Sequence, residues 1–129
     1  MRINFATIAL FLGASALARA DQLIPPEAVT LIQRVHSAAS AKDYSYLKSV
    51  MANDFAWSFG ADENTSSGAI AAWRHDPTYL KQLEQVTGQP CARTPEAYIE
   101  CPMNAGANYR AGFKLLSSGW RMVYFVAGD

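Results

Sequence analysis

Two histidines and the acids near them are the residues of this chain that could transfer protons. His36 follows Ile32 by four residues and so falls on the inner side of an expected helix. There it is either a general base in a pocket or a core-edge histidine bonded to a backbone carbonyl. His75 precedes Asp76, whose carboxylate is well placed to cap a helix starting at Pro77. Two histidines without a recognisable ligand spacing do not predict a metal site.

The two cysteines, Cys91 and Cys101, are separated by nine residues. This spacing does not match a CxxC redox pair, and no histidine lies close enough in the sequence to complete a zinc set. In an exported protein, an even number of cysteines predicts a disulfide. We therefore expect a structural Cys91–Cys101 disulfide, which over so short a loop stabilises the fold by about 2 to 3 kcal/mol.

Other motifs for catalysis or ligand binding are incomplete. The stretch Asp62–Gly68 has oxygen-bearing side chains at alternate positions, as a calcium loop requires. Its glycine, however, falls at the seventh position instead of the sixth, and Trp73 stands where a calcium loop has a bidentate glutamate. A GxSxG motif and the glycine pattern of nucleotide-binding loops are both absent from the sequence. We therefore expect neither a cofactor nor a metal.

The first twenty residues have the pattern of a secretory signal peptide. Arg2 supplies a positive start, Phe5–Leu17 is apolar, and Ala18-Arg19-Ala20 matches a signal-peptidase site. The apolar stretch is shorter than the roughly 20 residues that a membrane-spanning helix needs. We expect cleavage after residue 20, a mature chain of residues 21–129 with no stable membrane anchor, and a periplasmic or secreted location in a bacterium.

The charge balance excludes one class of partner. The 129-residue chain carries 11 Lys+Arg and 11 Asp+Glu, but Arg2 and Arg19 lie in the predicted signal peptide, which leaves nine basic residues in the mature chain. Nucleic-acid-binding proteins normally carry a clear basic excess, so we expect no nucleic-acid partner. The remaining length suits one domain with a single core.

Apolar residues at three- and four-residue spacing predict four helices. The first is expected over 26–42, with an inward stripe of Val29, Ile32, Val35 and Ala39. Asp43 is expected to cap the second, whose inward residues are Tyr44, Leu47, Val50 and Met51. A third is capped by Ser66 or Ser67, and a fourth runs from Pro77 to Thr87 and is ended by Gly88.

A two-residue period predicts the strands. The first is expected over 54–60, where Phe55, Trp57 and Phe59 form one aromatic face. The others are expected over 98–101, 109–116 and 120–127, with a tight turn at Ser117-Ser118-Gly119. Helices followed by an aromatic-rich sheet predict an α+β fold, a single domain whose N-terminal helices pack on one face of a curved antiparallel sheet.

The order of these segments also resembles a known family. The N-terminal helix, the segment Lys42–Leu47 leading into Met51–Phe55, and the closing hairpin Gly119–Phe125 look like the nuclear transport factor 2-like (cystatin-like cone) superfamily. The resemblance implies a conical pocket between sheet and helices, used by some members for isomerase or dehydratase chemistry and by many others for binding. In such a pocket Asp54 could pair with His36 as an acid/base dyad, although an Asp after an Asn also fits a plain turn.

Two functions therefore stand as alternatives. The preferred one is a small exported, non-enzymatic binding domain that docks a protein of the cell envelope, as an inhibitor or immunity-type protein does. Its interface would use two aromatic–arginine pairs if they are exposed, Trp73 with Arg74 and Tyr109 with Arg110. The alternative is a nuclear transport factor 2-like pocket domain that binds or transforms a small apolar ligand with His36 and Asp54.

Overall fold

The computed structural model describes residues 23–58 and 64–128, so the predicted signal peptide and the segment 59–63 lie outside the described residues. Within them, no helix is both long enough and apolar enough to cross a membrane. The elements, in chain order, are α2 (Pro26–Ala41), α3 (Tyr44–Val50), β1 (Met51–Ala56), α4 (Ser66–His75), α5 (Thr78–Thr87), β2 (Ala92–Arg93), β3 (Ile99–Cys101), β4 (Arg110–Leu116) and β5 (Gly119–Val126).

The first two helices begin and end where local signals predict. Pro26 lies in the first turn of α2, and Lys42 ends that helix in the left-handed conformation, with φ 56°. Asp43 caps α3 by accepting a hydrogen bond from the backbone N–H of Tyr46 at 3.0 Å. Val29, predicted to face inward, is exposed. The buried stripe of α2 is instead Ala28, Leu31, Ile32, Val35, Ala38 and Ala39.

The next two helices begin close to the predicted positions, but α5 begins at Thr78 with Pro77 as its N-cap residue and has no side-chain cap, so Asp76 does not cap it as predicted. Thr65 caps α4 in place of Ser66 or Ser67, because its Oγ1 accepts a hydrogen bond from the N–H of Gly68 at 2.9 Å. Before α5, the carboxylate of Asp76 accepts hydrogen bonds from the N–H and the hydroxyl of Thr78, at 3.1 and 2.7 Å. These two bonds, with a smaller contribution from His75, lower the pKa of Asp76.

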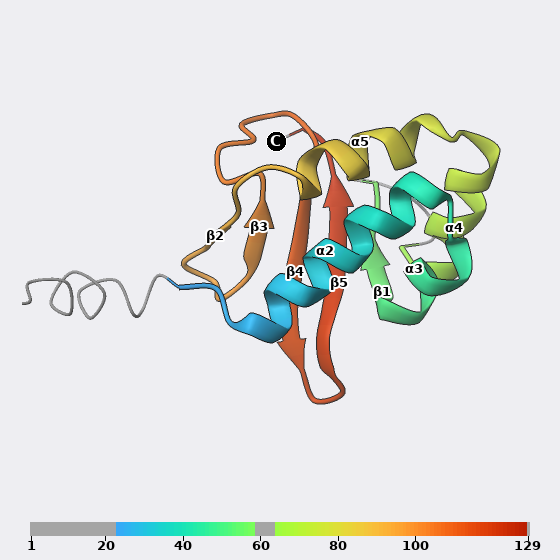
Figure 1. Cartoon of the computed structure of the whole chain (residues 1–129). Coiled ribbons are helices and arrows are strands. Elements are labelled where there is room, and N and C mark those ends of the chain that lie inside the picture. The colour runs from blue at the N-terminus through green and yellow to red at the C-terminus, as the bar shows by residue number, and fades with distance from the viewer. Residues whose placement is uncertain (1–22, 59–63, 129) are drawn as a thin grey trace, which may run out of the picture.

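The five strands form one mixed sheet in the order β1-β5-β4-β3-β2. Figure 1 shows α2 crossing one face of β4 and β5, with the other helices on the same side, which confirms the predicted α+β class. The sheet is not antiparallel throughout, because β1 pairs parallel with β5. A long connection separates these two strands in the sequence, so no hairpin forces them to run in opposite directions.

Strand β1 begins three residues before the predicted start, at Met51, directly after α3 ends at Val50. Phe55 is fully buried, as predicted, and Trp57 follows the end of the strand. Phe59, the third member of the predicted aromatic face, lies outside the described residues. Met51 therefore contributes to the core from a strand and not from a helix.

The space between the helices and the sheet is a packed core. Trp73 of α4 is fully buried and contacts Phe55 and Phe125 edge-on, with ring centroids 5.7 and 5.8 Å apart. Perpendicular rings of this kind are favourable aromatic pairs. Around Trp73, rings thus fill the place where the family resemblance implies a pocket.

Candidate functional site

The opposite face of strands β3, β4 and β5 carries a polar cluster, which we call the open face. In the sheet register Glu100 lies opposite Gly112, and Gly112 lies opposite Tyr124. These three positions alternate with buried residues such as Ile99 and Phe113, so they point away from the helices. A pocket of about 330 Å³ lies over this face, lined by Ala56, Thr94, Glu96, Tyr98, Glu100, Arg110, Tyr124 and Val126.

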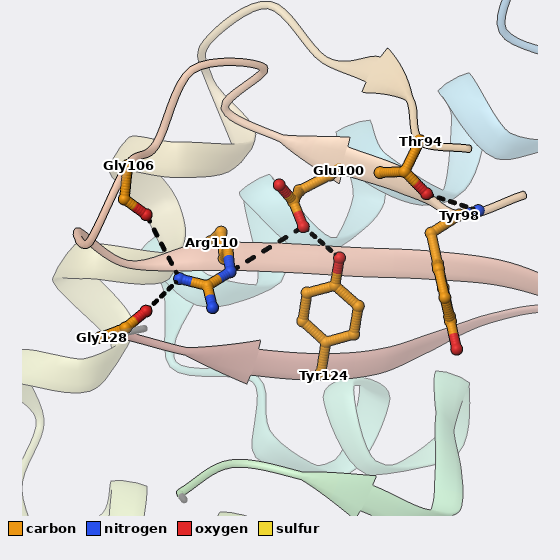
Figure 2. A network of polar contacts seen from close by, with 7 residues as sticks. All are labelled: Thr94, Tyr98, Glu100, Gly106, Arg110, Tyr124 and Gly128. Carbon is orange, nitrogen blue, oxygen red and sulfur yellow. Dashed lines mark hydrogen bonds and ion pairs between the residues drawn. The ribbon is translucent and has the colours of Figure 1, made fainter. Parts of the chain in front are cut away.

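Two residues that line the pocket are joined by a hydrogen bond, which the hydroxyl of Tyr124 donates to the carboxylate Oε2 of Glu100 (Figure 2). Burial raises the pKa of Tyr124 far above its ordinary value, and the hydrogen bond to Glu100 raises it further. Tyr124 therefore keeps its proton at neutral pH and remains a donor to Glu100.

Gly112 makes this arrangement possible. A Cβ atom at that position would lie 2.0 Å from Cε2 of the Tyr124 ring. The ring can lie on the neighbouring strand only because Gly112 has no side chain. This strand glycine is thus required by the close approach of Tyr124.

Arg110 holds the same carboxylate from the other side. Its Nε lies 3.9 Å from Oε2 of Glu100, and both side chains are mostly buried. Its Nη1 donates to the backbone carbonyls of Gly128 at 2.7 Å and Gly106 at 3.4 Å, as Figure 2 shows. Arg110 therefore fixes Glu100 and at the same time joins the end of the described chain to the loop before β4.

A disulfide-closed loop supplies the remaining wall of the pocket. Thr94 Oγ1 accepts a hydrogen bond from the N–H of Tyr98 at 3.2 Å, which closes the turn between β2 and β3. The ring of Tyr98 meets that of Tyr124 with centroids 5.5 Å apart. Cys91 and Cys101, at the two ends of this loop, are joined by the predicted disulfide. The covalent bond therefore holds the wall that carries Thr94, Glu96, Tyr98 and Glu100.

His36 and Asp54 do not form a hydrogen-bonded dyad. Nδ1 of His36 donates to the backbone carbonyl of Glu84 at 2.8 Å and lies 3.3 Å from Oγ1 of Thr87, so its described partners are on α5. Asp54 is exposed on β1. Of the two alternatives left open for His36, the structure shows the histidine bonded to a backbone carbonyl.

The two aromatic–arginine pairs do not form one surface patch. Trp73 belongs to the core, and the guanidinium of Arg74 lies over the ring of Tyr44, with Cζ 4.4 Å from the centroid. Tyr109 is half-buried and stacks on Phe125 at 5.0 Å. Burial raises the pKa of Tyr109, and the nearby Tyr79 raises it further. Of the four predicted interface residues, only Arg110 lines the open-face pocket.

Metal ligation has no site in the described part of the chain. There, no group of three or more His, Cys, Asp or Glu side chains could hold a metal ion. His75 is exposed at the end of α4, and the carboxylate of Asp76 accepts a hydrogen bond from the N–H of Thr78.

Comparison with known proteins gives one weak structural match. No protein-family model and no curated protein matches the chain. The fold is similar to the crystal structure of an NTF2-like protein with a cystatin-like fold from Novosphingobium aromaticivorans, with 21% sequence identity and a TM-score of 0.47. The match covers 94% of this chain and 90% of that one.

Sequence reasoning missed most of the pocket residues. The strand expected over 98–101 already implied that Tyr98 and Glu100 share a face opposite Ile99, because side chains alternate along a strand. A glutamate on a short strand beside a cysteine was the available signal. The partner of Glu100, Tyr124, lies far away in the sequence and could be found only from the strand register.

Proposed function

We propose that this chain is an exported binding domain whose ligand site is the open-face pocket. The observation that carries the proposal is the carboxylate of Glu100, which Tyr124 and Arg110 hold in one place on the wall of a pocket of about 330 Å³. Ligand sites are typically concave, about 300 to 1,000 Å³ in volume, and contain a few well-placed polar groups among apolar ones. Fixing those groups before binding reduces the entropy lost on binding.

The chemistry of the pocket supports binding more than proton transfer. A general base must accept a proton near neutral pH, whereas the raised pKa of Tyr124 keeps the phenol protonated. His36, the histidine proposed as a base, bonds to α5 on the helical side of the molecule. We therefore propose that the chain is a non-enzymatic domain that recognises a small molecule.

A ligand screen by NMR tests this function. The oxidised protein of residues 21–129, labelled with ¹⁵N, is titrated with a fragment library that contains acidic, basic and neutral compounds. Binding at the open face should shift the amide signals of Tyr98, Glu100 and Tyr124. If no fragment shifts these signals in the folded protein, the proposed function is wrong.

Two variants on β1 show whether binding uses the pocket. Ala56→Phe places a ring where Ala56 lines the pocket and should abolish the shifts. Asn53→Phe adds the same ring at an exposed position on the same strand, outside the pocket, and should leave binding unchanged. If Ala56→Phe binds the ligand as tightly as Asn53→Phe does, the ligand binds outside the open-face pocket.

Export is a separate part of the proposal and rests on the sequence pattern of residues 1–20. Mass spectrometry of the protein from a periplasmic fraction should give a chain that begins at Asp21. The variant Ala18→Lys, which replaces a small residue of the cleavage site, should accumulate as the uncleaved precursor. A wild-type protein that keeps Met1 and stays in the cytoplasm would contradict export.

Docking to a protein of the cell envelope stays a prediction from the sequence. It rests on the small size of the chain, the disulfide, the export signal and the absence of a catalytic motif. Of the residues named for its interface, Trp73 is buried and Arg110 pairs with Glu100, whereas Arg74 is exposed. A pull-down from envelope extract with the oxidised protein tests this hypothesis independently of the ligand screen.

A further inference from the structure

The positive charge that lines the open-face pocket is engaged by the chain itself. Nη1 of Arg110 donates to two backbone carbonyls, those of Gly106 and Gly128, and Nε faces Glu100. A guanidinium held in this way is oriented toward the protein and is a poor receptor for a carboxylate or phosphate ligand, since such ligands need its parallel N–H donors. These two hydrogen bonds of Arg110 thus go to backbone carbonyls, and its contact with Glu100 is an ion pair at 3.9 Å.

The negative charges of the pocket are less satisfied. Oε2 of Glu100 accepts a hydrogen bond from the hydroxyl of Tyr124 and lies 3.9 Å from Nε of Arg110. Oε1 has no hydrogen-bond partner in the described part of the chain and points away from both groups in Figure 2. Glu96, on the turn of the same wall, is exposed and forms no hydrogen bond or ion pair with described residues. An ionised carboxylate accepts hydrogen bonds only, so both groups favour a donor that carries positive charge.

The aromatic rings favour the same charge. Tyr98 and Tyr124 line the pocket beside Glu100, and the ammonium of Lys114 lies 4.8 Å from the centroid of the Tyr98 ring. The face of a tyrosine ring attracts cations. Lys114 therefore shows that a cation is accommodated at Tyr98, and the same lysine competes with any cation that enters from solution.

We infer that the ligand of the open-face pocket is a small organic ammonium ion, a primary amine with an apolar remainder. Its N–H groups would bond to Oε1 of Glu100, its charge would lie beside Tyr98, and its apolar part would contact Ala56 and Val126 at the floor. This inference rests on the proposed function, because it names the ligand class of the same pocket.

Three probes that share a phenethyl group but differ in the charge of the head group test the inference. Phenethylamine is a protonated primary amine at neutral pH, 2-phenylethanol is its neutral analogue, and 3-phenylpropanoate is an anion. In NMR titrations of the oxidised protein, the amine should bind about tenfold more tightly than the alcohol, and the anion should bind more weakly than either. Raising the salt concentration from about 0.05 to 0.5 M should weaken amine binding and leave alcohol binding unchanged.

Variants assign the preference to the named groups. Glu100→Gln keeps an acceptor for Tyr124 but removes the charge of Glu100, so most of the preference for the amine over the alcohol should be lost, and Glu96 and Tyr98 account for what remains. Glu27→Gln, an exposed glutamate on α2 outside the pocket, should change nothing. Lys114→Met keeps the alkyl chain without the competing charge and should tighten amine binding severalfold. The salt titration of the wild type gives the answer even if Glu100→Gln does not fold.

The outcomes separate this inference from the proposed function. If neutral or anionic fragments bind the pocket as tightly as the amine, the ammonium inference is wrong while the pocket remains a binding site. If neither these probes nor any library fragment shifts the pocket signals, the proposed function and the inference both fail. An amine preference of undiminished size in Glu100→Gln would also overturn the inference, because Glu100 would then contribute nothing to it.

Discussion

The ring of Tyr124 on β5 lies directly against the backbone of Gly112 on β4, so closely that a Cβ on the glycine would meet Cε2 of the ring at 2.0 Å. From this position the phenol hydroxyl reaches Glu100 on the next strand. One missing side chain on β4 thus allows a contact between β5 and β3 that defines the centre of the open-face pocket.

Gly112→Ala should destabilise the protein by about 1 to 3 kcal/mol, the usual cost of inserting a group into a packed site. The new methyl group must displace the Tyr124 ring and with it the bond to Glu100. Urea unfolding measures the change. In a Tyr124→Ala background the same substitution should cost far less, since the obstructing ring is gone. An equal cost in both backgrounds would mean that Tyr124 is not what excludes a side chain from position 112.

Tyr124→Phe should change how stability depends on pH above about 10. The folded protein holds the Tyr124 proton to a higher pH than the unfolded chain does, because burial and Glu100 raise the pKa. The contribution of protonated Tyr124 to the unfolding free energy is therefore fully present below the pKa of an ordinary tyrosine, and it is lost as the pH rises from that value through the raised pKa of the folded state. Unfolding free energy in the wild type should fall more steeply with alkaline pH than in Tyr124→Phe. Parallel curves would show that Tyr124 titrates normally.

Loss of the Cys91–Cys101 bond should lower the unfolding free energy by about 2 to 3 kcal/mol, because the unfolded chain then regains the entropy of the closed loop. The loop also carries Thr94, Tyr98 and Glu100, so ligand binding should weaken in the double variant Cys91→Ala/Cys101→Ala. Unfolding with and without a reductant measures the first effect, and NMR titration measures the second. Unchanged binding in a destabilised but folded variant would separate the disulfide from the pocket.

His36→Ala should lower the unfolding free energy by about 1 to 2 kcal/mol, since it leaves the carbonyl of Glu84 without its partner from α2. Binding at the open face should not change, because His36 joins two helices on the other side of the sheet. His75→Ala, at an exposed position, is the matched control and should alter stability by less than about 0.5 kcal/mol. A loss of ligand binding in His36→Ala would return this histidine to the functional site.

The local elements were predictable because short-range signals specify them. The cap at Asp43, the Pro26 start of α2 and the turn at Ser117-Ser118 each act within a few residues. Where the prediction erred, a distant contact decided the result. Helical spacing predicts that Met51 belongs to the second helix, but Met51 pairs with Met122 and so belongs to β1. Val29 is apolar and at helical spacing, yet it is exposed, because the face of α2 that packs on the core is the stripe that begins at Ala28.

The sequence by itself determined the four helices, four of the five described strands in outline, the α+β class and the cysteine pair, since composition, periodicity and capping are local properties of the chain. Only the tertiary structure decided which residues share a site. The sequence names both Trp73 and Arg110 as candidate interface residues. Packing places Trp73 in the core and Arg110 beside Glu100. The contact between Glu100 and Tyr124 depends on the register of three strands, and register is set by the packing of the whole sheet against its helices.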